Sequence, residues 1–370
     1  MGPYMVKSNR SIPSVLQNLW DHKLKNANLM MILSGSSMSF IENEVLGYKN
    51  PLYGRTTGIY KLEPLSFLET IEFFPDYSDE DKVIAYAILG GIPHYLLQFD
   101  KNLSLEDNVK KTILKRGSIL YNEVSFLLHE ELREPAVYNA IIEAVALGNT
   151  THNDIFMKTQ IEKRVLSVYL KNLIDLGIIK REFSILSPLQ DKTNSAKGNY
   201  SLVDNLFRFW YAFCNPNISG LESDRVDLIW KHLIKNELHR FASKAFEEIC
   251  TDYLMRKNDE EKLPFWFSNV GRWWGKVIKI DNGGNKTASA EEIDILAYDK
   301  AEKSFLLGEC TFRNEPFDLA EYRKLKGKSF FHGNVYYYLF ALSGFSDALK
   351  NEAATQKNVA LIPIHELFRM

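Results

Sequence analysis

The last third of this 370-residue chain alternates short apolar runs with turn signals, and this alternation constrains the fold more than any other feature. Runs of this length and composition are typical of β-strands. A long helix is predicted before them, over Asp227–Met255, and another lies among them, over Leu319–Lys328. This order predicts an α/β unit with a mixed central sheet. The predicted strands are Trp273–Ile280, Ile293–Tyr298, Ser304–Glu309, Val335–Leu342 and Val359–Pro363.

Two acidic residues fall on neighbouring strands of that sheet. Asp294 stands between two isoleucines, and Glu309 lies near the end of the next strand. The short connection 299–303 predicts an antiparallel hairpin, which can bring the two carboxylates together. With a backbone carbonyl, here that of Cys310, they can hold Mg²⁺ or Mn²⁺ with water left on the metal, and Glu247 on the long helix is a candidate third ligand. Such a metal activates water and stabilises charge on a scissile phosphate.

An acid followed one strand later by Glu-x-Lys is the pattern of the PD-(D/E)XK nucleases, and Asp294 with Glu309 resembles it with one departure. The lysine position is Thr311, whose hydroxyl offers no positive charge. That lysine orients the attacking water and neutralises the transition state. Two alternatives to cleavage stay open: a structural acid pair, or an inactive nuclease fold retained for binding. The nearby cations that could replace the lysine are Arg313, Lys324 and Lys326.

Three predicted helices and a hairpin follow one another in the middle of the chain, over 134–202. This is the order of elements in a winged helix-turn-helix, so we expect DNA in contact with the third helix and the wing. Acidic neighbours dilute the positive charge, and a solvated face for protein contacts is the alternative. The candidate DNA contacts are Lys163, Arg164 and Lys171 on the third helix, Lys180 and Arg181 on the first wing strand, and Lys192 and Lys197 at the wing tip.

Composition limits the partners and the compartment. The net charge is −2, so nucleic-acid binding must come from a local patch. The three cysteines are far apart and odd in number, which favours buried thiols in a reducing cytoplasm. No apolar run approaches the ~20 residues of a membrane span. We therefore expect a cytoplasmic protein with DNA as its partner and no membrane contact, and leave open a homo-oligomer.

Two stretches look like phosphate-binding loops but lack the required spacing. In Lys326-Gly327-Lys328-Ser329, Tyr322 stands where the first glycine of the loop belongs. In Gly271–Lys276 only three residues separate the glycines. Neither matches the loop that cradles nucleotide phosphates. The sequence therefore predicts no ATP hydrolysis by this chain alone.

Several short motifs occur in one order along nearly the whole chain. They are Leu33–Phe40, Pro51–Arg55, Leu62–Phe67 and Gly90–Tyr95, followed by Phe246–Cys250, Gly271–Gly275 and Glu292–Ile295. In this order they resemble the archaeal-type ATPases, which are relatives of AAA+ proteins within the STAND group. That family carries a C-terminal domain of unknown function.

The resemblance implies a place for each part of the chain. Because the family begins with a P-loop and a Walker B strand, the chain is expected to be an N-terminally truncated member or a fragment, with ATP as a ligand only if a missing portion exists. Ser36 would then be a sensor residue after a strand at 28–33, Arg55 a phosphate-sensing arginine, and Gly91 and Pro93 parts of a lid motif. Without a nucleotide, Arg55 would only pair with an acid.

The expected fold is an α/β multidomain chain. It comprises a remnant of the P-loop ATPase core over 1–61, a helical lid over 62–133, a winged helix-turn-helix over 134–214 and a restriction-endonuclease-like α/β domain over 215–370.

Overall fold

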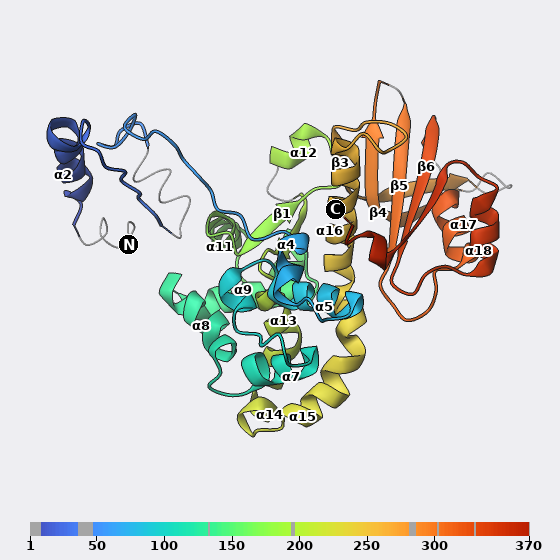
Figure 1. The fold of residues 1–370 in the computed structure, drawn as a ribbon, viewed down its shortest axis with the longest axis horizontal. Helices are drawn as coiled ribbons and strands as arrows, with labels where there is room; N and C mark the ends of the chain where they lie inside the picture. Colours follow the sequence, from blue (N-terminus) through green and yellow to red (C-terminus); the bar gives the residue numbers. More distant parts are fainter. Residues whose placement is uncertain are drawn as a thin grey trace. The chain divides into compact units, whose positions relative to one another are not determined.

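The computed structural model of the protein describes residues 9–35, 47–131, 134–193, 197–280, 286–301, 303–328 and 331–369 (Figure 1). The chain divides into two compact units. The first unit comprises Met1–Glu63 and Ile161–Lys180, and the second comprises Pro64–Gln160 and Arg181–Met370. No helix in the described part of the chain combines the length and the hydropathy of a membrane span.

The first unit contains α2 (Ile12–Leu19), which continues as the π-helix η1 (Trp20–Leu24), and α11 (Lys163–Asp175). The strand predicted over 28–33 is wrong, because residues 29–35 adopt no regular structure. Met30 is 84% exposed, and Ile32 is 75% exposed. A strand needs a neighbour to bond its backbone groups, and the described residues place none beside this run.

The second unit opens with helices α4 (Phe67–Thr70), α5 (Asp79–Leu89), α6 (Pro93–Leu96), α7 (Leu105–Val109) and α8 (Ile119–Glu131). The predicted helix break is confirmed. α5 ends at Gly90, whose φ of +60° and ψ of −154° suit glycine, and Pro93 begins α6. Serine side chains cap three of these helices by accepting a backbone N–H: Ser66, Ser78 and Ser104.

The predicted order of three helices and a hairpin is present in the middle of the chain. The helices are α9 (Pro135–Ala146), α10 (His152–Thr159) and α11, and the hairpin is the two-stranded sheet of β1 (Ile179–Glu182) and β2 (Asn199–Leu202). Gly177 has a φ of +73° just after α11, as its predicted role in ending that helix requires. The tip was expected to be irregular, but part of it forms the short helix α12 (Leu189–Thr193).

The long helix predicted over Asp227–Met255 is observed in pieces. The region begins with α13 (Asn205–Phe209), η5 (Trp210–Cys214), η6 (Asn215–Asn217) and α14 (Ile218–Glu222). The predicted range then covers α15 (Val226–Ile229), η7 (Trp230–Ile234), η8 (Lys235–Glu237) and α16 (Leu238–Asp259). The π-type turn of η7 and the 3₁₀ turn of η8 interrupt the α-helical hydrogen bonding before α16 begins.

A mixed five-stranded sheet follows, as predicted. Its order is β3 (Asn269–Ile280), β4 (Lys286–Asp299), β5 (Ser304–Thr311), β6 (Asn334–Ala341) and β7 (Val359–Pro363). β3 to β5 pair antiparallel, whereas β5 to β7 pair parallel. The helix α17 (Leu319–Gly327) was predicted, and α18 (Asp347–Ala354) was not.

Helices cover both faces of the sheet (Figure 1). Tyr253 of α16 contacts Phe340 edge to face on one side of β6. Tyr322 of α17 contacts Tyr337 on the other side. Because successive strand residues point to opposite faces, β6 contributes to two separate cores. A hydrophobic core lies between the sheet and α17–α18.

Candidate functional site

The hairpin of β4 and β5 brings Asp294 and Glu309 to neighbouring positions. Its ladder pairs Ile295 with Gly308, and Asp294 and Glu309 follow at the next step of the register. The Cys310 N–H donates to Asp294 Oδ2 at 2.9 Å. The predicted antiparallel hairpin is therefore confirmed, and the backbone of β5 orients the Asp294 carboxylate.

A register shift of the β-bulge kind interrupts the β3–β4 ladder beside Asp294. Gly271 of β3 pairs with Leu296, and Trp273 pairs with Ile293. Arg272 alone thus opposes two β4 residues, Asp294 and Ile295. An extra residue of this kind interrupts the alternation of side chains and can turn one of them toward a site.

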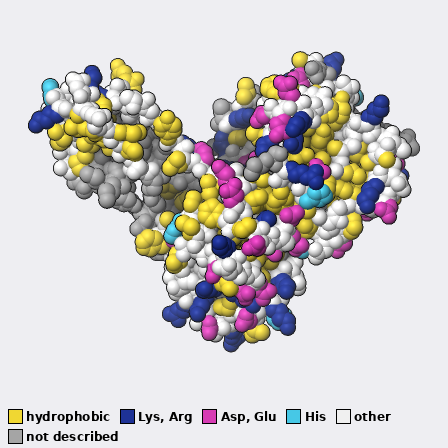
Figure 2. Space-filling view, in the orientation of Figure 1, with side chains coloured by type: hydrophobic (Ala, Val, Ile, Leu, Met, Phe, Trp, Pro, Cys, Tyr) yellow, Lys and Arg dark blue, Asp and Glu magenta, His cyan; other side chains and the backbone are white. Residues whose placement is uncertain are grey.

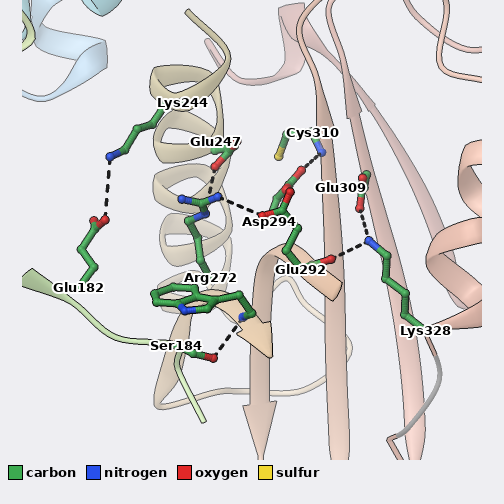
Figure 3. A network of polar contacts seen from close by, with 11 residues as sticks. Glu182, Ser184, Lys244, Glu247, Arg272, Glu292, Asp294, Glu309, Cys310 and Lys328 are labelled. Atoms are coloured by element: carbon green, nitrogen blue, oxygen red, sulfur yellow. Dashed lines mark hydrogen bonds and ion pairs between the residues drawn. The ribbon is translucent and has the colours of Figure 1, made fainter. Parts of the chain in front are cut away.

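Glu247 of α16 and Arg272 of β3 border Asp294 on one side (Figure 3). Arg272 Nε lies 3.3 Å from Glu247 Oε2, and its terminal nitrogen lies 3.7 Å from Glu292 Oε2. We call Glu247, Asp294 and Glu309 the carboxylate cluster. The helix and two strands therefore supply one acid each.

Lys328 borders the cluster on the other side (Figure 3). This residue follows the last residue of α17, and its side chain is only 8% exposed. Its Nζ donates to the Glu292 carbonyl oxygen at 2.6 Å and lies 3.6 Å from Glu309 Oε2. The sequence does not single out this cation, because its stretch resembles only an incomplete phosphate-binding loop.

The cations expected to replace the lysine lie in other contacts. Arg313 donates to Glu321 at 2.7 Å, and Lys326 lies 3.5 Å from Gln356. Lys324 acts on Glu309 only through charge, as a minor influence that lowers its pKa. Thr311 is 8% exposed on β5. Linear spacing gave no signal for Lys328, since 19 positions separate it from Glu309.

Burial makes ionisation of the cluster costly. Desolvation, followed by repulsion from Asp294, raises the pKa of Glu247 to about 8 and that of Glu309 to about 7. The pKa of Asp294 is also raised by burial, against the opposing Cys310 N–H bond. A negative charge on Asp294 thus disfavours ionisation of both Glu247 and Glu309.

The cluster is incompletely satisfied by protein groups. Within the described residues, Glu247 Oε2 and Glu309 Oε2 are buried oxygens without a hydrogen-bond partner. Carboxylate oxygens are the ligands that Mg²⁺ and Mn²⁺ prefer. In the part of the chain that is described, no three His, Cys, Asp or Glu side chains converge as a ready set around one ion. The donor chemistry therefore fits a hard cation, while the three acids are not gathered into a closed cage.

The seven predicted DNA contacts lie on α11, on β1 and in the connection between β1 and β2. Lys171 pairs with Asp175 at 2.8 Å. Arg181 donates to the Lys192 carbonyl oxygen at 2.7 Å, and its guanidinium lies 4.9 Å from the ring centre of Phe183. On the face drawn in Figure 2, basic and acidic side chains are interspersed. Lys163 and Arg164 begin α11, Lys180 lies on β1, and Lys197 precedes β2.

The residues predicted to read a nucleotide have local roles. Arg55 forms a two-point contact with Asp21, at 2.9 and 2.8 Å. At Gly91, a Cβ atom would lie 1.8 Å from the Leu65 carbonyl oxygen. Pro93 begins α6. Ser36 lies outside the described residues.

Comparison with known proteins follows the two parts of the chain. Residues 3–99 match a family described as an ATPase domain predominantly from Archaea. Residues 210–325 match a family of archaeal and bacterial proteins of unknown function. Residues 3–99 are therefore similar to an archaeal-type ATPase domain. The residues that match the second family include α16, the β4–β5 hairpin and the first part of α17. They therefore include all three acids of the carboxylate cluster.

One archaeal relative aligns with most of this chain. It is the uncharacterized protein MJECL04 of Methanocaldococcus jannaschii, 35% identical over 312 residues and 84% of this chain. The chain spans 66% of the length of that relative. Among solved structures, protein VC1899 from Vibrio cholerae aligns over 86% of this chain and 62% of its own, with 10% identity and a TM-score of 0.28.

Proposed function

We propose that the C-terminal α/β part of this chain is a metal-dependent nuclease, and that the helix-helix-helix-hairpin segment holds its DNA. The observation that carries the proposal is the carboxylate cluster. Among the described residues, two buried oxygens without a hydrogen-bond partner lie on either side of Asp294, and a buried lysine lies 3.6 Å from Glu309. Buried acids that are only partly satisfied cost stability, so they point to a functional site.

Each residue has a distinct role in this proposal. Asp294 and Glu309 would hold Mg²⁺ or Mn²⁺, with Glu247 as a third or outer ligand. Such an ion supplies activation of water and neutralisation of charge on a phosphodiester. Lys328 stands in for the lysine that Thr311 replaces, and places a positive charge beside Glu309 from a different element. Thr311 itself would only pack and orient the end of β5.

DNA recognition is a separate part of the proposal. Lys163, Arg164 and Lys171 would contact DNA from α11, and Lys180, Arg181, Lys192 and Lys197 from the wing. Lysine and arginine contacts to phosphates supply affinity without sequence preference. ATP belongs to the proposal only as a ligand of a longer form of the protein, since no phosphate-binding loop occurs in this sequence.

A non-catalytic DNA-binding or regulatory module is the second candidate. The observation in its favour is that Arg272 and Lys328 already lie beside Glu247 and Glu309. Two cations placed in this way can stabilise an acid cluster that no longer binds metal. Under this alternative the fold would be kept for contact alone.

Cleavage of plasmid and single-stranded DNA with Mg²⁺ or Mn²⁺ separates the two candidates. We expect metal-dependent cutting by the parent chain and its loss in Asp294→Asn and Glu309→Gln. Lys328→Met should reduce the rate at least about a hundredfold, the usual scale for a lost charge-stabilising or proton-transferring group. Lys326→Met is the matched control, because it removes a lysine two residues away that does not contact the cluster.

The opposite result is equally clear. If the parent does not cut either substrate but still retards DNA in a gel, the nuclease is excluded and the binding module remains. Cutting that persists in Asp294→Asn would instead indicate a contaminating enzyme.

A further inference from the structure

The chain that leaves the wing strand β1 lies along the edge of the five-stranded sheet. The Ile185 N–H donates to the Arg272 carbonyl oxygen at 2.9 Å. The Trp274 N–H donates to the Ser184 hydroxyl oxygen at 3.1 Å, and Ser184 is 7% exposed (Figure 3). An edge strand carries backbone groups that need partners. We call residues 183–187 the wing connection. They supply hydrogen-bond partners to two backbone groups of β3.

Arg272 joins the wing connection to the carboxylate cluster. Its backbone carbonyl is bonded by Ile185, while its guanidinium lies 3.3 Å from Glu247 and 3.7 Å from Glu292. It is also the residue opposite the β4 bulge that carries Asp294. A shift of β3 at this point would therefore move a positive charge relative to two acids of the cluster.

Arg272 and a bound cation would compete for the same atom. The carboxylate oxygen nearest the guanidinium is Glu247 Oε2, one of the two buried oxygens without a hydrogen-bond partner in the described chain. The Arg272 side chain is 40% exposed, so it has room to turn outward when a cation approaches Glu247. A more firmly held arginine would resist that exchange.

We propose that Arg272 is a positioning residue that holds Glu247 in the metal-free site, and that the wing connection regulates divalent-cation binding through it. This proposal rests on the proposed function in one respect, the carboxylate cluster as the cation site. A partner bound to the wing would reach the cluster through Ser184, Ile185 and Arg272. Because coupling between two sites is reciprocal, a bound cation would also alter the wing.

Titration of the full chain with Mn²⁺ alone tests whether the wing connection acts on cation binding through Arg272. Free Mn²⁺ is followed by its electron paramagnetic resonance signal. We expect Arg272→Gln to tighten Mn²⁺ binding by up to about fivefold, the scale of a partly exposed ion pair. Ser184→Ala, which removes the acceptor for Trp274, should tighten it by a smaller factor. Arg272→Lys should keep the parent affinity. Ser187→Ala is the matched control in the same connection and should change nothing.

The double variant Ser184→Ala/Arg272→Gln decides whether Ser184 acts through Arg272. If it does, the double variant binds Mn²⁺ as Arg272→Gln does, because the residue that transmits the effect is gone. The proposal would be overturned if the fold-changes in Mn²⁺ affinity of the two single variants multiply in the double variant. It would also be overturned if Ser184→Ala has no effect, or if the parent shows no saturable Mn²⁺ binding. Saturable binding that responds to Arg272→Gln without any DNA cleavage would refute the nuclease and leave this route standing.

Discussion

Gly91 approaches the backbone of Leu65 more closely than any side chain would permit. The Leu65 N–H donates to the Gly91 carbonyl oxygen at 2.8 Å, and a Cβ atom at Gly91 would lie 1.8 Å from the Leu65 oxygen. The motif Gly90-Gly91-Ile92-Pro93 thus has a structural reason in this chain, whether or not a nucleotide is ever bound. A glycine is required because backbone atoms, unlike a flexible side chain, cannot move aside.

Gly91→Ala is therefore expected to destabilise the helical part of the second unit. Overpacking of this kind costs about 1–3 kcal/mol, and a contact with backbone places it at the upper end or beyond. The measurement is urea unfolding monitored by circular dichroism, and the quantity compared is the midpoint of the transition that occurs at the lowest urea concentration. Gly327→Ala is the control, because no described atom beyond its own helix backbone and chain neighbours lies within 4 Å of its Cβ position, and its φ is ordinary. Equal midpoints for the two variants would contradict the close approach.

Single residues also mark where sequence reasoning stops. Asp294 and Glu309 were predictable, because their strands are adjacent in sequence and a short hairpin fixes their pairing. Lys328 was not, since only the return of α17 across the sheet brings it to Glu309. Arg55 could be named from its motif, but its contact with Asp21 depends on how residues 34 positions apart meet.

Elements with strong local signals were predicted well. All five strands of the sheet were located to within a few residues at most ends, because apolar runs and turns define them locally. The helix over Asp227–Met255 was expected to be continuous, and no glycine or proline announces the π and 3₁₀ turns that divide it. The strand expected at 28–33 shows the converse: an apolar run predicts burial, but only a partner can make it a strand.

The N-terminus of α13 carries a buried charge that local sequence could not reveal. Asp204 caps the helix by accepting the Leu206 and Phe207 N–H groups at 2.8 and 3.1 Å. Tyr95 donates to its other oxygen at 3.1 Å. Burial nevertheless dominates these bonds and raises the pKa of Asp204 to about 6 from an ordinary 3.8. The folded state therefore binds a proton more tightly at this position than the unfolded state does.

This shift predicts a pH dependence of stability. Between pH 3.8 and about 6 the folded chain holds more protons at Asp204, so this residue's contribution to stability falls as pH rises through that window. Above it the cost is on the order of 3 kcal/mol, from about two pKa units. Asp204→Asn keeps an oxygen for the cap and should be more stable than the parent at pH 7.5, with little difference near pH 4. Urea midpoints across this pH range provide the test, and an equal loss at every pH would contradict it.

At the scale of the whole molecule, a nearly neutral chain is proposed to bind a polyanion. The net charge of −2 gives no general attraction to DNA, and acidic and basic side chains are interspersed on the face drawn in Figure 2. Any affinity must then come from a few cations that approach phosphates together. Each phosphate contact releases counterions, so the slope of log affinity against log salt counts these contacts.

Lys163→Ala/Arg164→Ala should weaken duplex binding and reduce the magnitude of that slope by about 1.8, which is about 0.9 for each lost phosphate contact. Both the affinity and its salt slope can be measured by fluorescence anisotropy of a labelled duplex at about 50 to 200 mM salt. Affinity changes strongly over this range of salt concentration. Lys357→Ala is the control, because this exposed lysine lies between α18 and β7 and is not among the proposed DNA contacts. A slope that changes equally in the control would assign the effect to net charge. An unchanged slope in the double variant would remove α11 from the DNA interface and leave the wing residues as the only proposed contacts.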